Sequence, residues 1–327
     1  MNDLAALDAL AVEALLHFEM ATCGPPILFN LSENATYKVD SITGESWALR
    51  LHRPGYQTED SIASELAWTF ALREAGVATT PIAVRGRNGA FIQRTLKRSS
   101  QDERFAVLTK WEKGVTPEFT DLLESSFVTL GALTAHMHGH ARSWRRPTWF
   151  TRQNWDFESS LGDEKPLWGR WRNAIGMTRE HENLFDLTVE RIGSRLQRYG
   201  KSAQRFGLVH GDLRLANLLI DDSCIKILDF DDCGFGWFMY DAATTISFYE
   251  HVPQAPALLE AWKAGYRTVA PLAAEDEAEI QTFVMLRRLL LMAWISSHSE
   301  TDLAKSTGLK FTADSCGLCE NYLTRFE

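Results

Sequence analysis

Three polar residues about two thirds of the way along the chain stand at a spacing that could perform chemistry: Asp212, Asn217 and Asp229. In phosphoryl transfer from ATP, one carboxylate accepts the proton of the attacking hydroxyl, while an amide and a second carboxylate hold magnesium on the phosphates. Taken singly, such residues are ordinary loop, turn and strand-end residues. Their order, their spacing and the apolar segments between them together predict a catalytic site of this kind.

The apolar segments around these residues predict the elements that position them. Residues 218–220 and 225–228 are expected to form a strand pair that turns at 221–223 and presents Asp229 at its end. Further strands are expected at 27–30, 36–39, 47–51, 82–84, 90–93 and 105–109, with a charged loop at 94–104 and one helix running from Thr58 or Asp60 to Gly76. Helices are expected at 121–143, 167–199, 239–249, 255–269 and 274–297.

This order of elements predicts an α+β fold with two lobes, a small antiparallel β lobe and a larger, mainly helical lobe. We place the N-terminal, nucleotide-binding domain at residues 1–110 and the C-terminal, catalytic and substrate-binding domain at 111–327. Between two such lobes a ligand cleft is expected.

The composition argues against several classes of protein. The chain has 327 residues and a net charge of −9, from 34 basic and 43 acidic side chains, without a long basic run. Nucleic acid is therefore not expected as a partner, whereas a neutral or cationic small substrate is compatible with this charge.

No segment approaches the roughly 18 apolar residues of a membrane span, and the first 20 residues carry acidic groups that a signal peptide lacks. Five irregularly spaced cysteines favour the cytoplasm over an oxidising compartment. The oligomeric state stays open.

The motifs His210-Gly211-Asp212 and Leu228–Asp232, together with Ser32–Val39, resemble those of the aminoglycoside phosphotransferase and choline kinase family. The segment Leu49–Tyr56 is similar to the branches of type II homoserine kinases and bacterial stress-response kinases. The resemblance extends from about Leu28 to about Ile295, and it implies a protein-kinase-like fold that uses ATP and Mg²⁺.

The resemblance implies a role for each residue of the motif. Asp212 would be the general base, and His210 would brace the catalytic loop. Asn217 and Asp229 would bind magnesium, while Asp241 would anchor the loop from within the protein.

In the small lobe, the resemblance implies nucleotide contacts. Arg50 stands where most kinases have a lysine for the phosphates, and Glu65 would orient this cation. An arginine keeps the charge and adds a forked donor. The other expected nucleotide-binding residues are Ser32 and Asn34 in the first hairpin, and Thr109 and Trp111 in the hinge between the lobes.

Arg214 also departs from the family pattern. Next to the base, it is a candidate to stabilise charge on the transferred phosphoryl group, but it is equally compatible with solvent or an acidic partner. Asp232 and Glu250 are candidates for attracting a substrate ammonium group, and Trp237 is a candidate pocket wall. A flexible turn is expected at 234–236.

The identity of the acceptor stays open at this point. The motifs favour a hydroxyl group of a small metabolite, such as an amino alcohol, an amino acid, a sugar or an aminoglycoside. A Ser/Thr protein kinase of the stress-response branch and a nucleotide-binding pseudokinase are the alternatives. Neither the Cys316/Cys319 pair nor the alternating histidines 136, 138 and 140 have the partners of a metal site.

Overall fold

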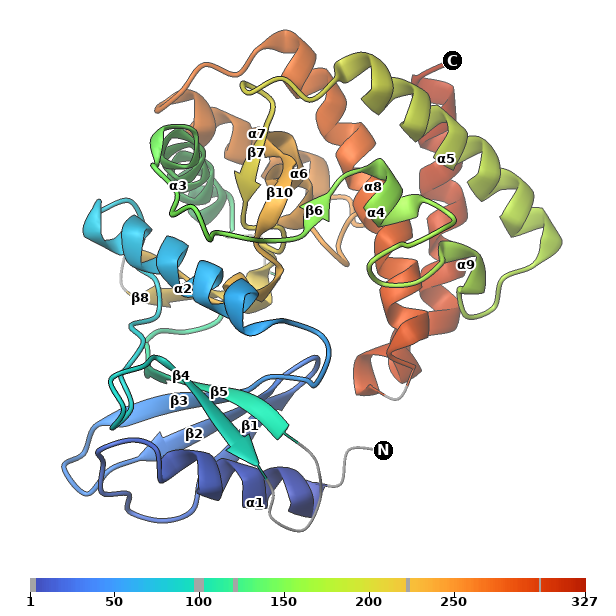
Figure 1. Ribbon diagram of the computed structural model, residues 1–327. Coiled ribbons are helices and arrows are strands. Elements are labelled where there is room, and N and C mark those ends of the chain that lie inside the picture. Colours follow the sequence, from blue (N-terminus) through green and yellow to red (C-terminus); the bar gives the residue numbers. More distant parts are fainter. Residues whose placement is uncertain (1–3, 97–102, 120–122, 222–223, 300) are drawn as a thin grey trace. The chain divides into compact units, whose positions relative to one another are not determined.

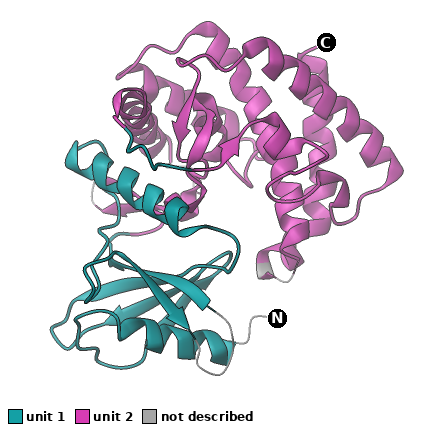
Figure 2. Cartoon of the chain, viewed as in Figure 1, with its two compact units in different colours: residues 1–114, 146–151 teal, residues 115–145, 152–327 magenta. Residues whose placement is uncertain are grey.

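The computed structural model describes residues 4–96, 103–119, 123–221, 224–299 and 301–327 (Figure 1). These residues form two compact units (Figure 2). Unit 1 comprises residues 1–114 and 146–151, and unit 2 comprises 115–145 and 152–327. The assignment of domains to 1–110 and 111–327 stays a prediction, from which the two units differ by placing 111–114 and 146–151 with unit 1.

Unit 1 contains one antiparallel sheet of β1 (Ile27–Leu31), β2 (Ala35–Asp40), β3 (Ser46–Leu51), β4 (Ile92–Leu96) and β5 (Glu103–Lys110). The strand order is β1-β2-β3-β5-β4. Every second residue of β2 is buried, which is typical of a sheet with one face on the core. Helix α1 (Leu4–Leu15) contributes Leu7 and Leu10 to the same apolar cluster as Tyr37 and Leu49.

Helix α2 (Glu59–Glu74) begins and ends where the sequence predicts. Thr58 caps its start by accepting a hydrogen bond from the Ser61 N–H at 3.1 Å. Gly76, at φ +65°, ends it in the left-handed conformation that favours glycine. The helix carries Glu65 to Arg50 of β3, and the two side chains form an ion pair at 2.5 Å.

Unit 2 is mainly helical. Its helices are α3 (Glu124–Ser143), α4 (Phe157–Leu161), α5 (Arg179–Tyr199), α6 (Phe238–Thr244), α7 (Ala255–Arg267), α8 (Ala274–Ser297) and α9 (Asp302–Arg325). Its strands are β6 (Asn154–Trp155), β7 (Phe206–Val209), β8 (Leu218–Asp221), β9 (Cys224–Ile227) and β10 (Gly234–Trp237). Strands β8 and β9 form the predicted pair, while β10 lies between β6 and β7 in a second small sheet.

Several elements differ from the expectation. The predicted flexible turn at 234–236 is wrong, because these residues form β10. A Cβ atom on Gly234 would lie 2.5 Å from the Gln153 carbonyl oxygen, so this glycine permits close strand packing. The predicted helix 167–199 begins only at Arg179, since Gly176 at φ +78° is left-handed and Thr178 supplies the N-cap.

Other differences concern the ends of elements. Residues 82–84 form no regular strand, although Val84 N–H donates to the Leu108 carbonyl at 2.8 Å. Helix α9, which carries Cys316 and Cys319, was not predicted. Part of the predicted loop 94–104 belongs to β4 and β5. Residues 97–102 of that loop, 121–122 of a predicted helix and 222–223 of the predicted hairpin turn lie outside the described residues.

The predicted α+β class is confirmed, with an antiparallel sheet preceding a mainly helical part. Among the described helices, none has the length and apolar character needed to cross a lipid bilayer.

Candidate active site

The candidate catalytic loop, residues 210–217, follows the end of β7 and leads into β8. Gly211 adopts φ +82°, and a Cβ atom there would lie 2.8 Å from the Asp232 carbonyl oxygen. A larger residue at this position would therefore meet both backbone strain and a steric clash. This glycine allows the loop to turn tightly between His210 and Asp212.

Asp241 anchors this loop through hydrogen bonds to the loop backbone. Its carboxylate is fully buried and accepts the backbone N–H groups of Gly211 at 2.8 Å and His210 at 3.0 Å. His138 of α3 places its Nε2 atom 3.1 Å from the same carboxylate and its Nδ1 atom 3.2 Å from the Tyr266 hydroxyl. A buried charge with several hydrogen bonds restricts the loop to one position.

His210 braces the loop and stays neutral. Its Nδ1 atom accepts the backbone N–H of Asp212 at 3.2 Å, so we assign the proton to Nε2, which donates to the Leu228 carbonyl at 3.0 Å. Burial lowers the pKa of His210. The side chain therefore links the loop to the residue before Asp229 and does not serve as a proton carrier.

Asp212 lies at the centre of the site, with both carboxylate oxygens in use. Oδ1 accepts a hydrogen bond from Arg287 of α8, and Oδ2 accepts Asn217 Nδ2 at 2.7 Å and Arg214 Nε at 3.1 Å. Burial alone would raise the pKa of Asp212, but the guanidinium groups of Arg214 and Arg287 outweigh it and hold the pKa below its usual range. Asp212 is thus ionised and fixed in direction.

Asn217 and Asp229 are brought together by the β8–β9 ladder. Leu218 pairs with Ile227, and Leu228 N–H donates to the Asn217 carbonyl at 2.8 Å, so Leu228 lies opposite Asn217 and Asp229 is the next residue along the chain. Asp229 itself adopts the left-handed conformation at φ 52°. This is rare for a residue other than glycine and is concentrated at functional sites.

These two residues fit a magnesium ion. Asn217 Nδ2 donates to the Asp212 carbonyl at 2.9 Å and to Oδ2 at 2.7 Å, so both amide hydrogens point to Asp212 and leave Oδ1 as an oxygen donor for a cation. No group of three or more His, Cys, Asp or Glu side chains among the described residues could hold a metal. A site with few protein oxygens is typical of Mg²⁺, which retains water and takes phosphate oxygens as further ligands.

Comparisons with known proteins place the chain among phosphotransferases. The profile of the phosphotransferase enzyme family matches residues 30–274. The chain belongs to this family. Membership confirms the resemblance drawn from the sequence and the predicted enzyme class.

A solved microcompartment-associated aminopropanol kinase is 39% identical to this phosphotransferase, with a TM-score of 0.89 over 99% of this chain and 98% of that one. Amicoumacin kinase of Bacillus subtilis (strain 168) is 26% identical over 227 residues, which are 68% of this chain and 63% of that kinase. The match thus spans less than two thirds of the curated relative. A solved amicoumacin kinase in complex with AMP-PNP, Ca²⁺ and Ami shares the fold, with 19% identity and a TM-score of 0.78 over 98% of this chain and 94% of that one.

The expected nucleotide-binding residues of the phosphotransferase lie in unit 1. Arg50 and Glu65 pair as described above, while the Asn34 side-chain oxygen accepts the Arg53 N–H at 3.1 Å. Ser32 N–H donates to the Asn34 carbonyl at 3.0 Å, which closes the turn between β1 and β2. Thr109 lies in β5, opposite Ala48 of β3. Trp111 is the first residue after β5, and its ring packs edge-on against Phe29 with the ring centroids 5.0 Å apart.

Within the two units the structure brings most of the predicted residues together in two pairs and one cluster, whereas Thr109 and Trp111 contact Ala48 and Phe29 instead. Arg50 pairs with Glu65, and Ser32 pairs with Asn34. The candidate catalytic loop and Asp229 form the cluster in unit 2.

The sequence analysis missed Arg287, which bonds to Asp212, and the two aromatic residues that contact Arg287, Tyr240 and Trp168. Arg287 lies within a long buried stretch of α8, where it interrupts a run of mostly apolar residues. Its guanidinium carbon lies 5.1 Å from the Trp168 ring centroid, and its Nη1 lies 3.2 Å from the Tyr240 hydroxyl. An arginine within such an apolar run could have indicated a buried ion pair, since buried charges are paired.

Two suggested substrate contacts do not hold. Trp237 is a core residue, 2% exposed, whose Nε1 donates to the Gly200 carbonyl at 2.7 Å, so it does not line a pocket. The fully buried side chain of Glu250 pairs with Arg288 at 2.8 Å, and its charge is therefore neutralised within the protein. Asp232, in contrast, keeps a partly exposed position close to the catalytic loop.

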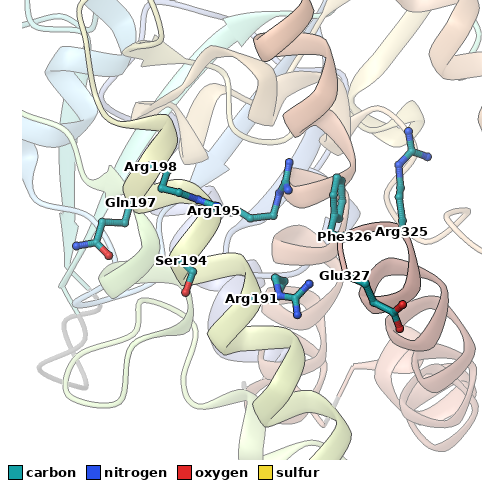
Figure 3. Close-up of a pocket in the computed structure, with 8 residues that line it drawn as sticks. All are labelled: Arg191, Ser194, Arg195, Gln197, Arg198, Arg325, Phe326 and Glu327. Atoms are coloured by element: carbon teal, nitrogen blue, oxygen red, sulfur yellow. The ribbon is translucent and has the colours of Figure 1, made fainter.

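A surface pocket of about 630 Å³ lies between α5 and the end of α9 (Figure 3). Half of its lining residues are arginines: Arg191, Arg195, Arg198 and Arg325. None of its lining residues belongs to the motifs of the phosphotransferase, so the candidate active site is elsewhere.

Proposed function

We propose that this protein is a kinase that transfers the γ-phosphate of ATP to the hydroxyl group of a small amino alcohol. The observation that carries the proposal is the ionised, doubly braced carboxylate of Asp212 beside the oxygen donors of Asn217 and Asp229. The amino alcohol is suggested by the 39% identity to an aminopropanol kinase along nearly the whole chain.

The chemistry divides between the substrates and the residues of the chain. ATP supplies the phosphoryl group, and Asn217 and Asp229 would hold Mg²⁺, which would neutralise charge on the phosphates when bound. Asp212 accepts the proton of the acceptor hydroxyl as the new oxygen–phosphorus bond forms and the bond to the leaving ADP oxygen breaks. Because its pKa is low, Asp212 acts mainly by orienting the hydroxyl and takes the proton late in the transfer.

One carboxylate near Asp212, that of Asp232, suits an acceptor with an ammonium group. Asp232 interacts electrostatically with Arg287 and Tyr240, which places its carboxylate near the catalytic loop. An ammonium group there would gain a charge-assisted hydrogen bond. The named relatives are small-molecule kinases, which favours a metabolite over the alternative of a protein acceptor. The presence of Asp212, Asn217 and Asp229 together argues against the pseudokinase alternative, because a module without turnover need not retain all three.

The test is a γ-phosphate transfer screen with Mg²⁺ and ATP. The acceptors are 1-aminopropan-2-ol, ethanolamine, homoserine, a hexose, an aminoglycoside and a generic protein, with propan-2-ol as the matched acceptor without an amine. We expect the highest kcat/KM for an amino alcohol and a loss of about 100-fold or more for propan-2-ol, because a site built for a charged group rejects an analogue that lacks it. Preference for the protein, or no Mg²⁺-dependent ATP consumption with any acceptor, would overturn the proposal.

A further inference from the structure

Arg287 is the most extensively bonded buried cation beside the catalytic loop. It is 1% exposed and comes from α8, 75 residues away from Asp212 in the chain. Its Nε donates to the Ser247 hydroxyl at 3.0 Å, its Nη1 to the Tyr240 hydroxyl at 3.2 Å and to the Gly211 carbonyl at 3.4 Å, and its Nη2 to Asp212 Oδ1. One guanidinium thus joins α8, α6 and the catalytic loop.

Arg214, the other cation on Asp212, is held differently. The Arg214 side chain is 31% exposed, against 2% for Arg287. Apart from Asp212, the Arg214 guanidinium carbon faces the Phe248 ring, 5.9 Å from its centroid. A long, partly exposed side chain with few partners exchanges readily, whereas a buried fork with four acceptors does not.

The two oxygens of Asp212 therefore have different roles. A carboxylate offers about four acceptor positions, two on each oxygen. The buried Arg287 occupies Oδ1, whereas Oδ2 carries Asn217, its neighbour in the loop, and the exchangeable Arg214. A substrate hydroxyl that displaces Arg214 would bind Oδ2. This oxygen is hydrogen-bonded to Asn217, one of the two expected metal ligands.

We propose that Arg287 is a positioning residue for phosphoryl transfer, which holds Asp212 Oδ1 and the Gly211 carbonyl from α8 so that Oδ2 faces the acceptor hydroxyl. The inference rests on the proposed function. It assigns to α8 a direct link to the reacting carboxylate, in addition to its place in the core. Without this link Asp212 would rotate toward other donors, and the acceptor hydroxyl would lose its alignment.

The experiment compares Arg287→Met and Arg287→Lys with Arg288→Met. Arg288 is the matched control because it is the next residue of α8 and equally buried, but its partners are Glu250 at 2.8 Å, Ser315 at 2.8 Å and the Phe311 carbonyl at 3.0 Å. For each variant, kcat and both KM values are measured, and folding is followed by circular dichroism and thermal melting. Arg195→Gln, which removes a mostly buried arginine of α5 that pairs with Glu279 of α8, is a milder control.

We expect Arg287→Met to lower kcat about 100-fold while the KM for ATP changes less than about threefold, since misplacing a reacting group acts on the chemical step. Arg287→Lys should recover about tenfold, because a lysine restores the charge but not the fork. Arg288→Met and Arg195→Gln should lower the melting temperature and leave kcat within about threefold. The inference is overturned if folded Arg287→Met keeps kcat within threefold, or if a control variant loses as much activity.

Two further outcomes are separable. If Arg287→Met does not fold, Arg287→Lys carries the test, because it keeps the buried charge, and a wild-type kcat in this variant overturns the inference. If the wild-type protein transfers phosphate to no acceptor, the proposed function fails. The role of Arg287 is then read from a crystal structure of Arg287→Lys, where an unchanged side-chain direction of Asp212 would contradict it.

Discussion

Replacing Asp241 by asparagine tests whether the catalytic loop is held by one buried carboxylate. Oδ1 of Asp241 accepts the Gly211 N–H at 2.8 Å, and Oδ2 accepts the His210 N–H at 3.0 Å. Whichever way an asparagine amide turns, its NH₂ group faces one of these backbone donors. His138 can adapt by moving its proton to Nδ1, but a backbone N–H cannot change its role.

The expected loss follows from this geometry. One hydrogen bond to a charged acceptor disappears, and one fully buried backbone N–H is left unsatisfied. Together these effects should reduce the free energy of unfolding by about 2–4 kcal/mol. Because the displaced N–H belongs to Gly211 or His210, the change should also lower kcat by moving Asp212.

The assay is urea unfolding at pH 7.5, followed by tryptophan fluorescence and circular dichroism. Asp156→Asn is the matched control, because Asp156 caps α4 by accepting the Ser159 N–H at 3.0 Å and also pairs with Lys201 at 2.8 Å. Asparagine caps a helix as well as aspartate does, and a partly exposed ion pair contributes at most about 1 kcal/mol. If Asp241→Asn reduces stability by less than about 1 kcal/mol, or no more than Asp156→Asn, the anchoring role is refuted.

Three other predictions concern the base, the buried histidines and the nucleotide contact. Asp212→Ala should lower kcat about a thousandfold while ATP binding, measured by calorimetry, stays within a few-fold; near-normal turnover would contradict its role as base. Burial lowers the pKa of His138 and His210 below the ordinary value of 6.5, so the unfolded chain binds more protons as the pH falls below 6.5. The free energy of unfolding should therefore drop by more than about 1 kcal/mol between pH 7.5 and 5.5, and a flat profile in urea titrations would show that these rings are not buried neutral. Arg50→Met should raise the KM for ATP about tenfold or more without changing the KM for the acceptor, and Arg50→Lys should restore most of it; equal values for all three proteins in steady-state kinetics would exclude Arg50 from the nucleotide site.

Local sequence patterns predict those parts of the candidate site that depend on residues close together in the chain. Asn217 comes five residues after Asp212, and an antiparallel strand pair returns the chain so that Leu228, the residue before Asp229, lies opposite Asn217. Because a hairpin register depends on a short stretch of chain, the local pattern was sufficient to predict the strand pair that returns the chain to this loop. The same holds for α2, whose start at Thr58 is a capping signal in the sequence.

The prediction of a turn was wrong where glycines allow close packing between strands. Gly234 and Gly236 were interpreted as a turn, but in β10 they allow the strand to lie against Gln153 and Trp155. A glycine that provides freedom for a turn and a glycine that provides space for a neighbour look alike until the neighbour is known.

The sequence by itself thus determined the α+β class and the family of this protein, and it predicted a base, an amide and a carboxylate at fixed spacing. Only the tertiary structure decided how the base is held. Arg287 reaches Asp212 from 75 residues away, and His138 reaches Asp241 from 103 residues away. The partner of a buried charge is chosen by the packing of helices distant in sequence, where the need to satisfy every buried polar group selects among many candidate side chains.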